Sequence, residues 1–268
     1  MSTASESWNN QLLMALPDGE RQRWLTQFEP VQLRAGQVLC EAGAIPSHVL
    51  FPTTAIVSLL YETASGASAE IAVVGNEGMT GIALFMGGQS TPSRAMVRSS
   101  GAALRLPAQT VKDTFTRSEP VRRLLLHYTL TLIAQTMQTA VCNRHHSVDQ
   151  QLCRWLLLSL DRLQGNEIVV TQELIAQMLG VRRETVTEVA LALQKDGLIS
   201  YVRGHISVRD RAGLEGRACE CYAVVRREQD RLLPANAVFS RHDPEPRRRA
   251  TPPRVSLVNP TSREPVPA

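Results

Sequence analysis

The sequence lacks long apolar runs, a strong excess of either charge and a dense set of cysteines. No run reaches the roughly 20 apolar residues of a membrane-spanning helix, and the polar first residues carry no signal-peptide pattern. The 29 Lys and Arg residues against 25 Asp and Glu give a net charge of +4, which implies modest non-specific attraction to nucleic acid. The 268 residues suggest about two domains without a membrane span.

The five cysteines are scattered, as in a protein kept in a reducing compartment, and we expect a cytoplasmic location. Cys40 stands alone in the N-terminal part, so the clustered thiolates that an iron–sulfur cluster needs are missing there. A Walker loop, a His-Glu-x-x-His motif and a Ser elbow are missing as well. The scattered Glu77, Asp113 and His127 form no constellation, and we predict that the protein is not an enzyme.

A helix–turn–helix pattern spans Thr171 to Gly197. Thr171 suits an N-cap, Glu173 lies in the positive first turn, and Gly180 suits a left-handed helix end. Apolar residues repeat with helical spacing on both sides of this glycine. Two such helices joined by a tight turn can place a helix in the DNA major groove, although helical hairpins also serve other folds. The stripes are Leu174, Ile175, Met178 and Leu179 in the first helix, and Val186, Val189, Ala190 and Leu193 in the second.

Polar residues of the second helix are predicted to face outward, and two arginines lie at its N-terminal end, which usually contacts base edges. Arg183 suits a bidentate contact to guanine, and Glu184 suits the cytosine amino group. The alternative is a set of solvated charges on an ordinary hairpin. The candidate DNA contacts on the two helices are Thr171, Gln172, Arg182, Arg183, Glu184, Thr187 and Glu188.

Short strand-like runs flank this pattern. Residues 167–170 precede the first helix, and two alternating runs, 198–202 and 205–208, follow the second around a turn at Arg203. A helix–turn–helix followed by a hairpin is the winged arrangement. Arg203 and His205 at the tip of this wing are predicted to contact backbone phosphate.

The R-E-T-V segment that begins at Arg183, taken with these elements, resembles the signature of the Crp/Fnr superfamily of transcription regulators. The resemblance covers about residues 20 to 210. In that family the matching Arg and Glu read bases, and a second Arg follows one turn later. This chain has Glu188 there, so the family's usual target sequence is not carried over. The resemblance implies a homodimer on a palindromic site in double-stranded DNA, with RNA polymerase as a further partner.

The N-terminal half changes from a helical to a strand-like period. Residues up to Phe28 predict helix, and seven short strand-like runs separated by glycines then favour a small barrel or sandwich. The resemblance makes this part a β-roll that senses an effector. The predicted fold class is α+β, with an N-terminal β-roll or jelly-roll sensor domain, a long dimerisation helix and a C-terminal winged helix–turn–helix domain. The apolar side of the first segment is Leu12, Leu13, Leu16, Trp24 and Leu25.

A long helix is predicted from Glu119 to Asn143, because the segment has no glycine and its only proline, Pro120, suits a first turn. One apolar side follows coiled-coil spacing and is predicted to meet a second subunit, as the resemblance also implies. The other side is predicted to meet the roll; the alternative is a core helix of a monomer. The coiled-coil stripe is Leu126, Leu130, Ile133, Met137 and Ala140, and the other side is Leu125, Tyr128 and Leu132.

Family members that bind cyclic AMP carry a Gly-Glu-Leu turn and a later Arg followed by a small residue, which hold the phosphate and the ribose. The corresponding loop spans residues 76–83, and Arg94-Ala95 matches the later pair. Ile82 stands where the family has its carboxylate, and Glu77 lies at a different offset. These departures disfavour a cyclic nucleotide, haem is disfavoured as well, and the effector is not identified. The candidate pocket residues are Gly78, Gly81, Ile82, Arg94 and Ala95.

Two clusters of metal-ligating residues remain. Cys142 shares a helix face with His145 or His146, and Cys219-x-Cys221 brings two thiols close in sequence. A Cys-x-Cys pair lacks zinc-finger spacing, and no second pair is expected to complete it. Strand geometry would point both of its thiols the same way, which disfavours a disulfide. We predict no metal site and interpret the first cluster as a hinge with polar caps or dimer contacts.

The Pro- and Arg-rich end, with its Arg247-Arg248-Arg249 triplet, cannot bury a core and is predicted to be disordered. The predicted parts are a helical segment over 1–28, the sensor over 29–117, the dimerisation helix over 118–146, the DNA-binding domain over 147–212, a C-terminal helix over 213–234 and a tail over 235–268.

Basic and acidic residues nearly balance between Thr171 and Asp210. This balance leaves an alternative open, in which the chain is a ligand- or redox-sensing module whose helical hairpin binds a protein. DNA binding weakens steeply with salt through counterion release, whereas a protein contact need not. The operator sequence and the direction of regulation are left open as well.

Overall fold

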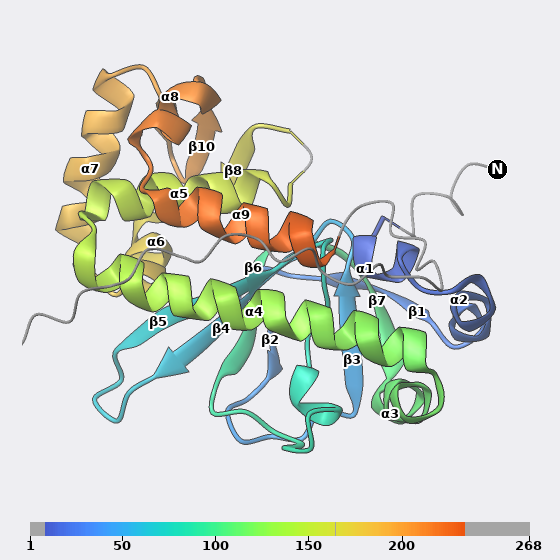
Figure 1. Ribbon diagram of the computed structural model, residues 1–268. Coiled ribbons are helices and arrows are strands. Elements are labelled where there is room, and N and C mark those ends of the chain that lie inside the picture. The colour runs from blue at the N-terminus through green and yellow to red at the C-terminus, as the bar shows by residue number, and fades with distance from the viewer. Residues whose placement is uncertain (1–8, 164, 234–268) are drawn as a thin grey trace, which may run out of the picture. The chain divides into compact units, whose positions relative to one another are not determined.

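The computed structural model describes residues 9–163 and 165–233 (Figure 1). Within these residues, antiparallel sheets alternate with helices along the chain. No helix within these residues has the length and apolar character to cross a bilayer. The predicted tail over 235–268 and the first eight residues lie outside the described part.

Two sheets form the N-terminal roll. One sheet has the strand order β2-β6-β4-β5 and the other the order β1-β7-β3. Every neighbouring pair is antiparallel. The seven strand-like runs seen in the sequence all become strands, which confirms the α+β roll. The strands are β1 (Glu29–Leu33), β2 (Val38–Cys40), β3 (His48–Pro52), β4 (Ile56–Glu62), β5 (Ser68–Val74), β6 (Arg94–Ser99) and β7 (Gly101–Pro107).

The helical segment before the roll is two short helices, α1 (Gln11–Met14) and α2 (Asp18–Leu25). The Asn10 side chain caps α1 by accepting from the Leu13 N–H, 3.1 Å away. The predicted apolar side is buried except for Leu25, which is 41% exposed. The prediction is wrong for that residue because the chain leaves the helix around Pro17, and α2 restarts with a different phase.

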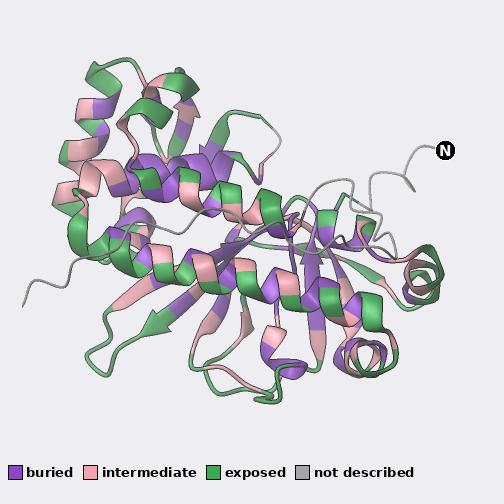
Figure 2. Cartoon of the chain, viewed as in Figure 1, coloured by how far each residue is buried: buried purple, intermediate pink, exposed green. Residues whose placement is uncertain are grey.

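Helix α4 (Glu119–His145) follows α3 (Ala108–Arg117) and has two different sides. Leu125, Tyr128 and Leu132 are buried, as predicted for the side that meets the roll. The coiled-coil stripe is exposed, with Leu130 at 42% and Met137 at 65%. Figure 2 shows the two classes alternating along the helix.

The described part of the C-terminal half contains a three-stranded sheet, β8-β10-β9, and the five helices α5 to α9. The C-terminal helix predicted over 213–234 is divided in two. Ala218 and Cys219 are extended (ψ 152° and 164°), so the chain forms two helices, and Asp210 caps the first by accepting from the Gly213 N–H. The elements are α5 (Val148–Leu160), β8 (Glu167–Val169), α6 (Gln172–Leu179), α7 (Arg183–Lys195), β9 (Ile199–Val202), β10 (His205–Val208), α8 (Arg211–Arg217) and α9 (Glu220–Leu232).

One apolar core joins the roll to the C-terminal half. Ile56, Leu60 and Val73 of strands β4 and β5 belong to the same buried cluster as Trp155 and Leu156 of α5. Helix α6 also packs against β5. Burial of apolar surface, about 25 cal/mol per Å², therefore holds these two parts together.

Candidate functional site

The turn between α6 and α7 has the local geometry that the sequence predicts. Thr171 Oγ1 accepts from the Leu174 N–H at 3.2 Å and caps α6. Gly180 ends α6 with φ 67°, a left-handed conformation that strains a residue with a Cβ. Helix α7 then begins at Arg183 and buries Val186 as part of its apolar stripe.

The N-terminal half of α7 is exposed at Arg182, Arg183, Glu184 and Glu188, as predicted. Thr187 does not simply face outward. It is half-buried, and its Oγ1 lies 2.8 Å from Gln172 Oε1 and 3.0 Å from the Arg183 carbonyl oxygen. The Thr187 and Gln172 side chains therefore lock α6 to α7 and fix the direction of the exposed residues.

The hairpin after α7 is built as a wing. Arg203 and Gly204 at its tip have φ of 48° and 83°, as a two-residue type I′ turn requires. Tyr201 Oη donates to the Val170 carbonyl at 2.9 Å, and the Val170 N–H donates to the Gly204 carbonyl at 2.8 Å. The wing is thus tied to the start of α6, with Arg203 and His205 exposed.

The wing contacts α7, since the Tyr201 N–H donates to Gln194 Oε1 at 2.8 Å. Burial raises the pKa of Tyr201, and the charge of the nearby Arg183 guanidinium opposes that shift. The N-terminal end of a helix carries about half a positive charge, to which Arg182 and Arg183 add theirs. Such a surface can bind phosphate and donate hydrogen bonds to base edges.

The roll contains a cavity of about 370 Å³ that α4 closes on one side. Its lining is mostly apolar, with Leu39, Leu59 and Ile71 among the roll residues and Leu132 from α4. Among the described residues that line it, none is Arg, Lys, Asp or Glu. A ligand of this cavity would therefore meet mostly apolar groups, a few hydroxyl and amide groups, and the His48 side chain.

The predicted pocket residues separate into two groups. Gly81, Ile82 and Ala95 line the cavity, whereas Gly78 and Arg94 do not. The Arg94 guanidinium is outside, 2.8 Å from Glu41 Oε2 and 3.5 Å from Glu62 Oε2.

Gly78 instead packs under the Tyr128 ring, where a Cβ would overlap the ring atoms. Tyr128 Oη donates to the Met79 carbonyl at 2.7 Å, so α4 is hydrogen-bonded directly to this loop. The glycine is required for a close approach between loop and helix.

A buried ionic network links the same loop to the C-terminal half, and the sequence analysis did not find it. Arg162 donates to Glu77 Oε1 through Nε (2.8 Å) and Nη2 (2.7 Å), and Glu77 Oε2 accepts from the Gly75 N–H at 3.0 Å. Nearby, Arg98 pairs with Glu70 at 3.1 Å. Glu77 is therefore held by a partner 85 residues away, a pairing that no local pattern signals.

Arg98 also contacts α5 directly. Its Nη2 donates to Ser159 Oγ at 2.8 Å, and its guanidinium lies 4.4 Å from the centroid of the Trp155 ring. Burial lowers the pKa of Arg98, and the charge of Glu70 opposes this shift. The Arg98–Glu70 pair thus lies within the roll and reaches α5 through Ser159 and Trp155, whereas the Arg162–Glu77 pair itself joins the two parts.

The prediction that no second pair completes Cys219-x-Cys221 is wrong. The structure brings Cys142 and His146 to these two thiols, with the four ligating atoms within 4.8 Å of one another. His145 is exposed and lies outside the group. Cys221 is in a helix, so the strand geometry assumed for this pair is wrong, although both thiols lie in the same group.

Comparison with known families places two of these units. Residues 30–118 match the family described as "Cyclic nucleotide-binding domain", and residues 150–217 match the "Crp-like helix-turn-helix domain". No curated protein sequence matches the chain.

Solved structures share this fold, and two of the following three are called regulators in their titles. A putative transcriptional regulator of the Crp/Fnr family from Eubacterium rectale has a TM-score of 0.61 at 18% identity, covering 78% of this chain and 97% of its own. FixK2 from Bradyrhizobium japonicum has a TM-score of 0.61 at 15% identity, covering 72% and 98%. The c-di-GMP-responsive global regulator CLP from Xanthomonas campestris has a TM-score of 0.58 at 15% identity, covering 72% and 100%.

Proposed function

We propose, since this chain belongs to the Crp/Fnr superfamily of transcription regulators, that it is a homodimer that reads a palindromic DNA site through the N-terminal half of α7. The observation that carries this proposal is the exposed group Arg182, Arg183 and Glu184 at the start of a helix whose direction is fixed. As a regulator it would act in the cytoplasm, with RNA polymerase as an expected further partner.

Base reading is proposed for two exposed side chains of α7. Arg183 can donate two hydrogen bonds to a guanine, and Glu184 can accept from a cytosine amino group. Glu188, one turn later, carries the opposite charge to an arginine and is expected to disfavour guanine at its position. Each good bidentate contact discriminates between bases by about 1–3 kcal/mol.

Phosphate contacts are proposed for the residues that surround Arg183 and Glu184. Arg203 and His205 extend from the wing tip, and Arg182 and Thr171 lie at the exposed N-terminal ends of α7 and α6. Such contacts position a protein on the duplex without reading sequence. Gln172 is proposed to support Thr187 instead of reaching the DNA, because their side chains bond to each other.

The dimer is proposed to form through the exposed stripe of α4. The stripe is exposed and keeps coiled-coil spacing, which is the arrangement that two parallel helices bury between them, and two of its residues, Ile133 and Met137, also border the cavity. A two-fold axis there would present two copies of α7 to the same face of DNA. The expected separation is about 34 Å, one helical turn.

The effector is proposed to be a neutral, largely apolar molecule that fills the 370 Å³ cavity. A cyclic nucleotide carries a phosphate charge, and the arginine expected to hold it, Arg94, is paired with Glu41 outside the cavity. Burying an unpaired charge costs several kcal/mol. The lining therefore favours an uncharged ligand.

Effector binding and DNA binding are proposed to be coupled through residues on two walls of the cavity. Ile133 and Met137 of the dimer stripe also line the cavity, so a ligand there and a second subunit would meet at the same residues. On the other wall, Gly81 and Ile82 follow the loop whose Glu77 holds Arg162. Effector and DNA affinities would then depend on each other.

Binding-site selection from a randomised duplex pool tests the proposal, using wild type, Arg183→Ala and the control Arg34→Ala. Arg34 is an exposed arginine of the roll, so the control removes the same charge away from α7. A palindromic motif is expected for wild type and for the control. Arg183→Ala should lose about 1–3 kcal/mol of specific affinity and blur one base preference. An unchanged motif for Arg183→Ala would refute base reading by this residue.

The same selection repeated with cyclic AMP tests the effector proposal, which expects no response. A cyclic-AMP-dependent motif would overturn the assignment of an uncharged ligand. A salt titration separates DNA binding from the alternative of a protein-binding hairpin, because only the former must weaken steeply with salt.

A further inference from the structure

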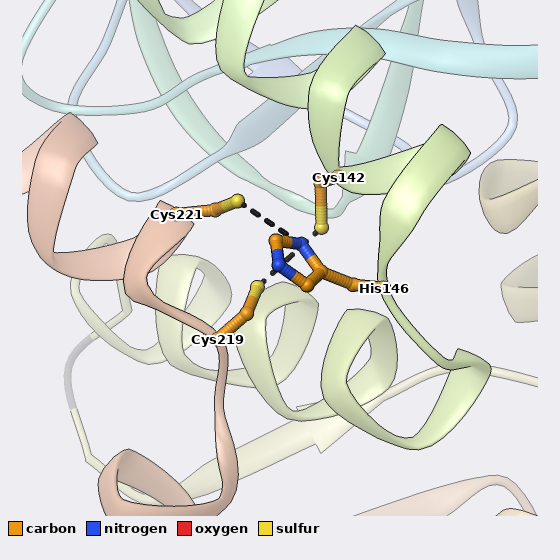
Figure 3. A group of neighbouring side chains, drawn as sticks. All are labelled: Cys142, His146, Cys219 and Cys221. Carbon is orange, nitrogen blue, oxygen red and sulfur yellow. Dashed lines mark hydrogen bonds between the residues drawn. The ribbon is translucent and has the colours of Figure 1, made fainter.

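Four side chains from distant parts of the chain converge where α4 ends and α9 begins (Figure 3). Cys142 lies in the last turns of α4, and His146 is the C-cap of that helix. Cys219 is the N-cap of α9, and Cys221 lies in its first turn. All three cysteines are buried, at 5% exposure or less, and the His146 side chain is 14% exposed.

The local chain geometry explains how each pair faces inward. The His146 N–H donates to the Cys142 carbonyl at 3.0 Å, which keeps the helical i,i+4 relation and places both side chains on one side. At the other end, Cys219 and Cys221 both point their sulfur atoms toward that side (Figure 3).

Two of the distances between the ligating atoms are close to those of a tetrahedral metal site. Ligand sulfurs at about 2.3 Å from zinc are roughly 3.8 Å apart, and a sulfur and a nitrogen ligand are roughly 3.5 Å apart. Here Cys142 Sγ and Cys219 Sγ are 3.6 Å apart, and Cys221 Sγ lies 3.3 Å from His146 Nδ1. All four ligating atoms lie within 4.8 Å of one another, a spread that one ion can bridge.

Two further side chains, Glu220 and Gln138, lie within hydrogen-bonding range of these four residues and can orient them as metal ligands. With Nδ1 toward the thiols, His146 directs Nε2 to Glu220 Oε1 at 3.4 Å, the carboxylate–histidine arrangement that orients a metal-bound imidazole. Gln138 Nε2 donates to Cys221 Sγ at 3.1 Å, as to a thiolate.

A buried cation near the thiols also suits a site of net negative charge. The Arg154 side chain is buried beside this group, where its Nη2 donates to Thr139 Oγ1 at 2.7 Å and its Nε has no hydrogen-bond partner among the described residues. Three thiolates and a divalent ion carry one net negative charge, which Arg154 can balance.

We propose that Cys142, His146, Cys219 and Cys221 bind one Zn²⁺ in a closed, four-coordinate structural site. Three thiolates and one imidazole are a donor set that selects zinc, and four protein ligands leave no open position for chemistry. Binding releases the protons that the three thiols still hold.

The position of the site gives the ion a specific structural role. The helix–turn–helix match spans residues 150–217, and the ligands lie just before and just after it. One ion would therefore fasten both chain connections of the DNA-binding unit to the end of α4. Removing it would free α9 and the joint at His146 without touching the roll.

Metal content of the full-length chain, purified under reducing conditions without chelator and then dialysed, tests the proposal. Elemental analysis is expected to find one zinc per chain. Refolding with Co²⁺ in place of zinc is expected to give the strong visible bands of a tetrahedral thiolate site. A wild-type protein with less than 0.1 zinc per chain and no such Co²⁺ spectrum would overturn the proposal.

Variants test which residues bind the ion. Cys219→Ser and His146→Gln are expected to reduce zinc to less than half of the wild-type content, whereas Cys40→Ser and Cys153→Ala are expected to keep it. The two controls remove the cysteines outside the cluster, one half-buried and one buried. Equal loss in Cys153→Ala would overturn the assignment of ligands.

Two measurements on the wild type keep the test decisive if a ligand variant fails to fold. Native mass spectrometry should show a mass increase of one zinc, and chelation should raise hydrogen exchange in α9 while leaving β4 and β5 protected. Loss of 2 Da with two fewer free thiols would instead identify a Cys142–Cys219 disulfide and overturn the proposal. A brown protein with several iron and sulfide ions per chain would do the same.

Discussion

Replacing Glu77 by Gln removes one charge from the ion pair that joins the loop after β5 to the C-terminal end of α5. Arg162 and Glu77 are both buried, with side chains 3% and 7% exposed, and Arg162 has two N–H groups on the same carboxylate oxygen. The variant keeps the shape of the side chain. It leaves the Arg162 guanidinium without its counter-charge in an apolar setting.

The expected cost follows from this geometry. Two unit charges about 4 Å apart attract by about 4 kcal/mol at an effective dielectric constant of about 20. Removing one partner of a buried pair costs about 3–5 kcal/mol, because the other charge remains desolvated. Arg98 is close enough for its pKa to be lowered further by Arg162, so the network would be left with an excess positive charge.

Urea unfolding, followed by tryptophan fluorescence and circular dichroism, measures the effect, since urea does not screen charges. Glu29→Gln is the matched control: it breaks the cross-strand pair with Arg105, whose side chains are 39% and 59% exposed, and should cost about 1 kcal/mol or less. The double variant Glu77→Gln/Arg162→Met should be more stable than Glu77→Gln alone. If Glu77→Gln lowers the free energy of unfolding no more than Glu29→Gln does, the proposed role of this pair in stability is wrong.

Leu130→Glu should raise the dimer dissociation constant, measured by sedimentation, at least 100-fold. The variant buries one charge per subunit in place of a leucine side chain whose burial is worth about 1.5–3 kcal/mol. Met14→Glu, at an exposed site outside α4, is the control and should leave the dimer intact. Gly78→Ala should destabilise by about 1–3 kcal/mol in thermal or urea unfolding through overlap with the Tyr128 ring, whereas Gly19→Ala, with open space around it, should not; equal effects would contradict the close-approach argument. Chelation of zinc should weaken specific DNA binding about tenfold in a fluorescence titration, with restoration by added zinc; unchanged affinity would separate the metal site from DNA binding.

Local sequence patterns were sufficient to predict most of the helices and strands. The 3.6-residue period and the caps Thr171 and Gly180 define α6 and α7, because helix ends depend on a few neighbouring residues. The two-sided pattern of α4 likewise separates the side that meets the roll from the exposed stripe. The break between α8 and α9 was missed, since neither Ala218 nor Cys219 is a strong helix breaker.

Site residues were predictable only where their role is local. The exposure of Arg183 and Glu184 follows from their helical phase, whereas Thr187 was misplaced because its partner, Gln172, belongs to another helix. Arg94 matched a sequence pattern for phosphate binding, but Glu41, 53 residues away, holds it outside the cavity. Single-sequence patterns carry no information on such partners.

The sequence by itself determined the order and type of the elements, the winged helix–turn–helix and the two sides of α4, because these depend on periodicity and on residues a few positions apart. Only the tertiary structure decided the contacts between distant segments. Chain folding places Arg162 beside Glu77 and forms a mostly apolar cavity between the roll and α4. It also brings Cys142 to a thiol 77 residues later, because the packing of α9 along α4 is fixed by the whole fold and by no local motif.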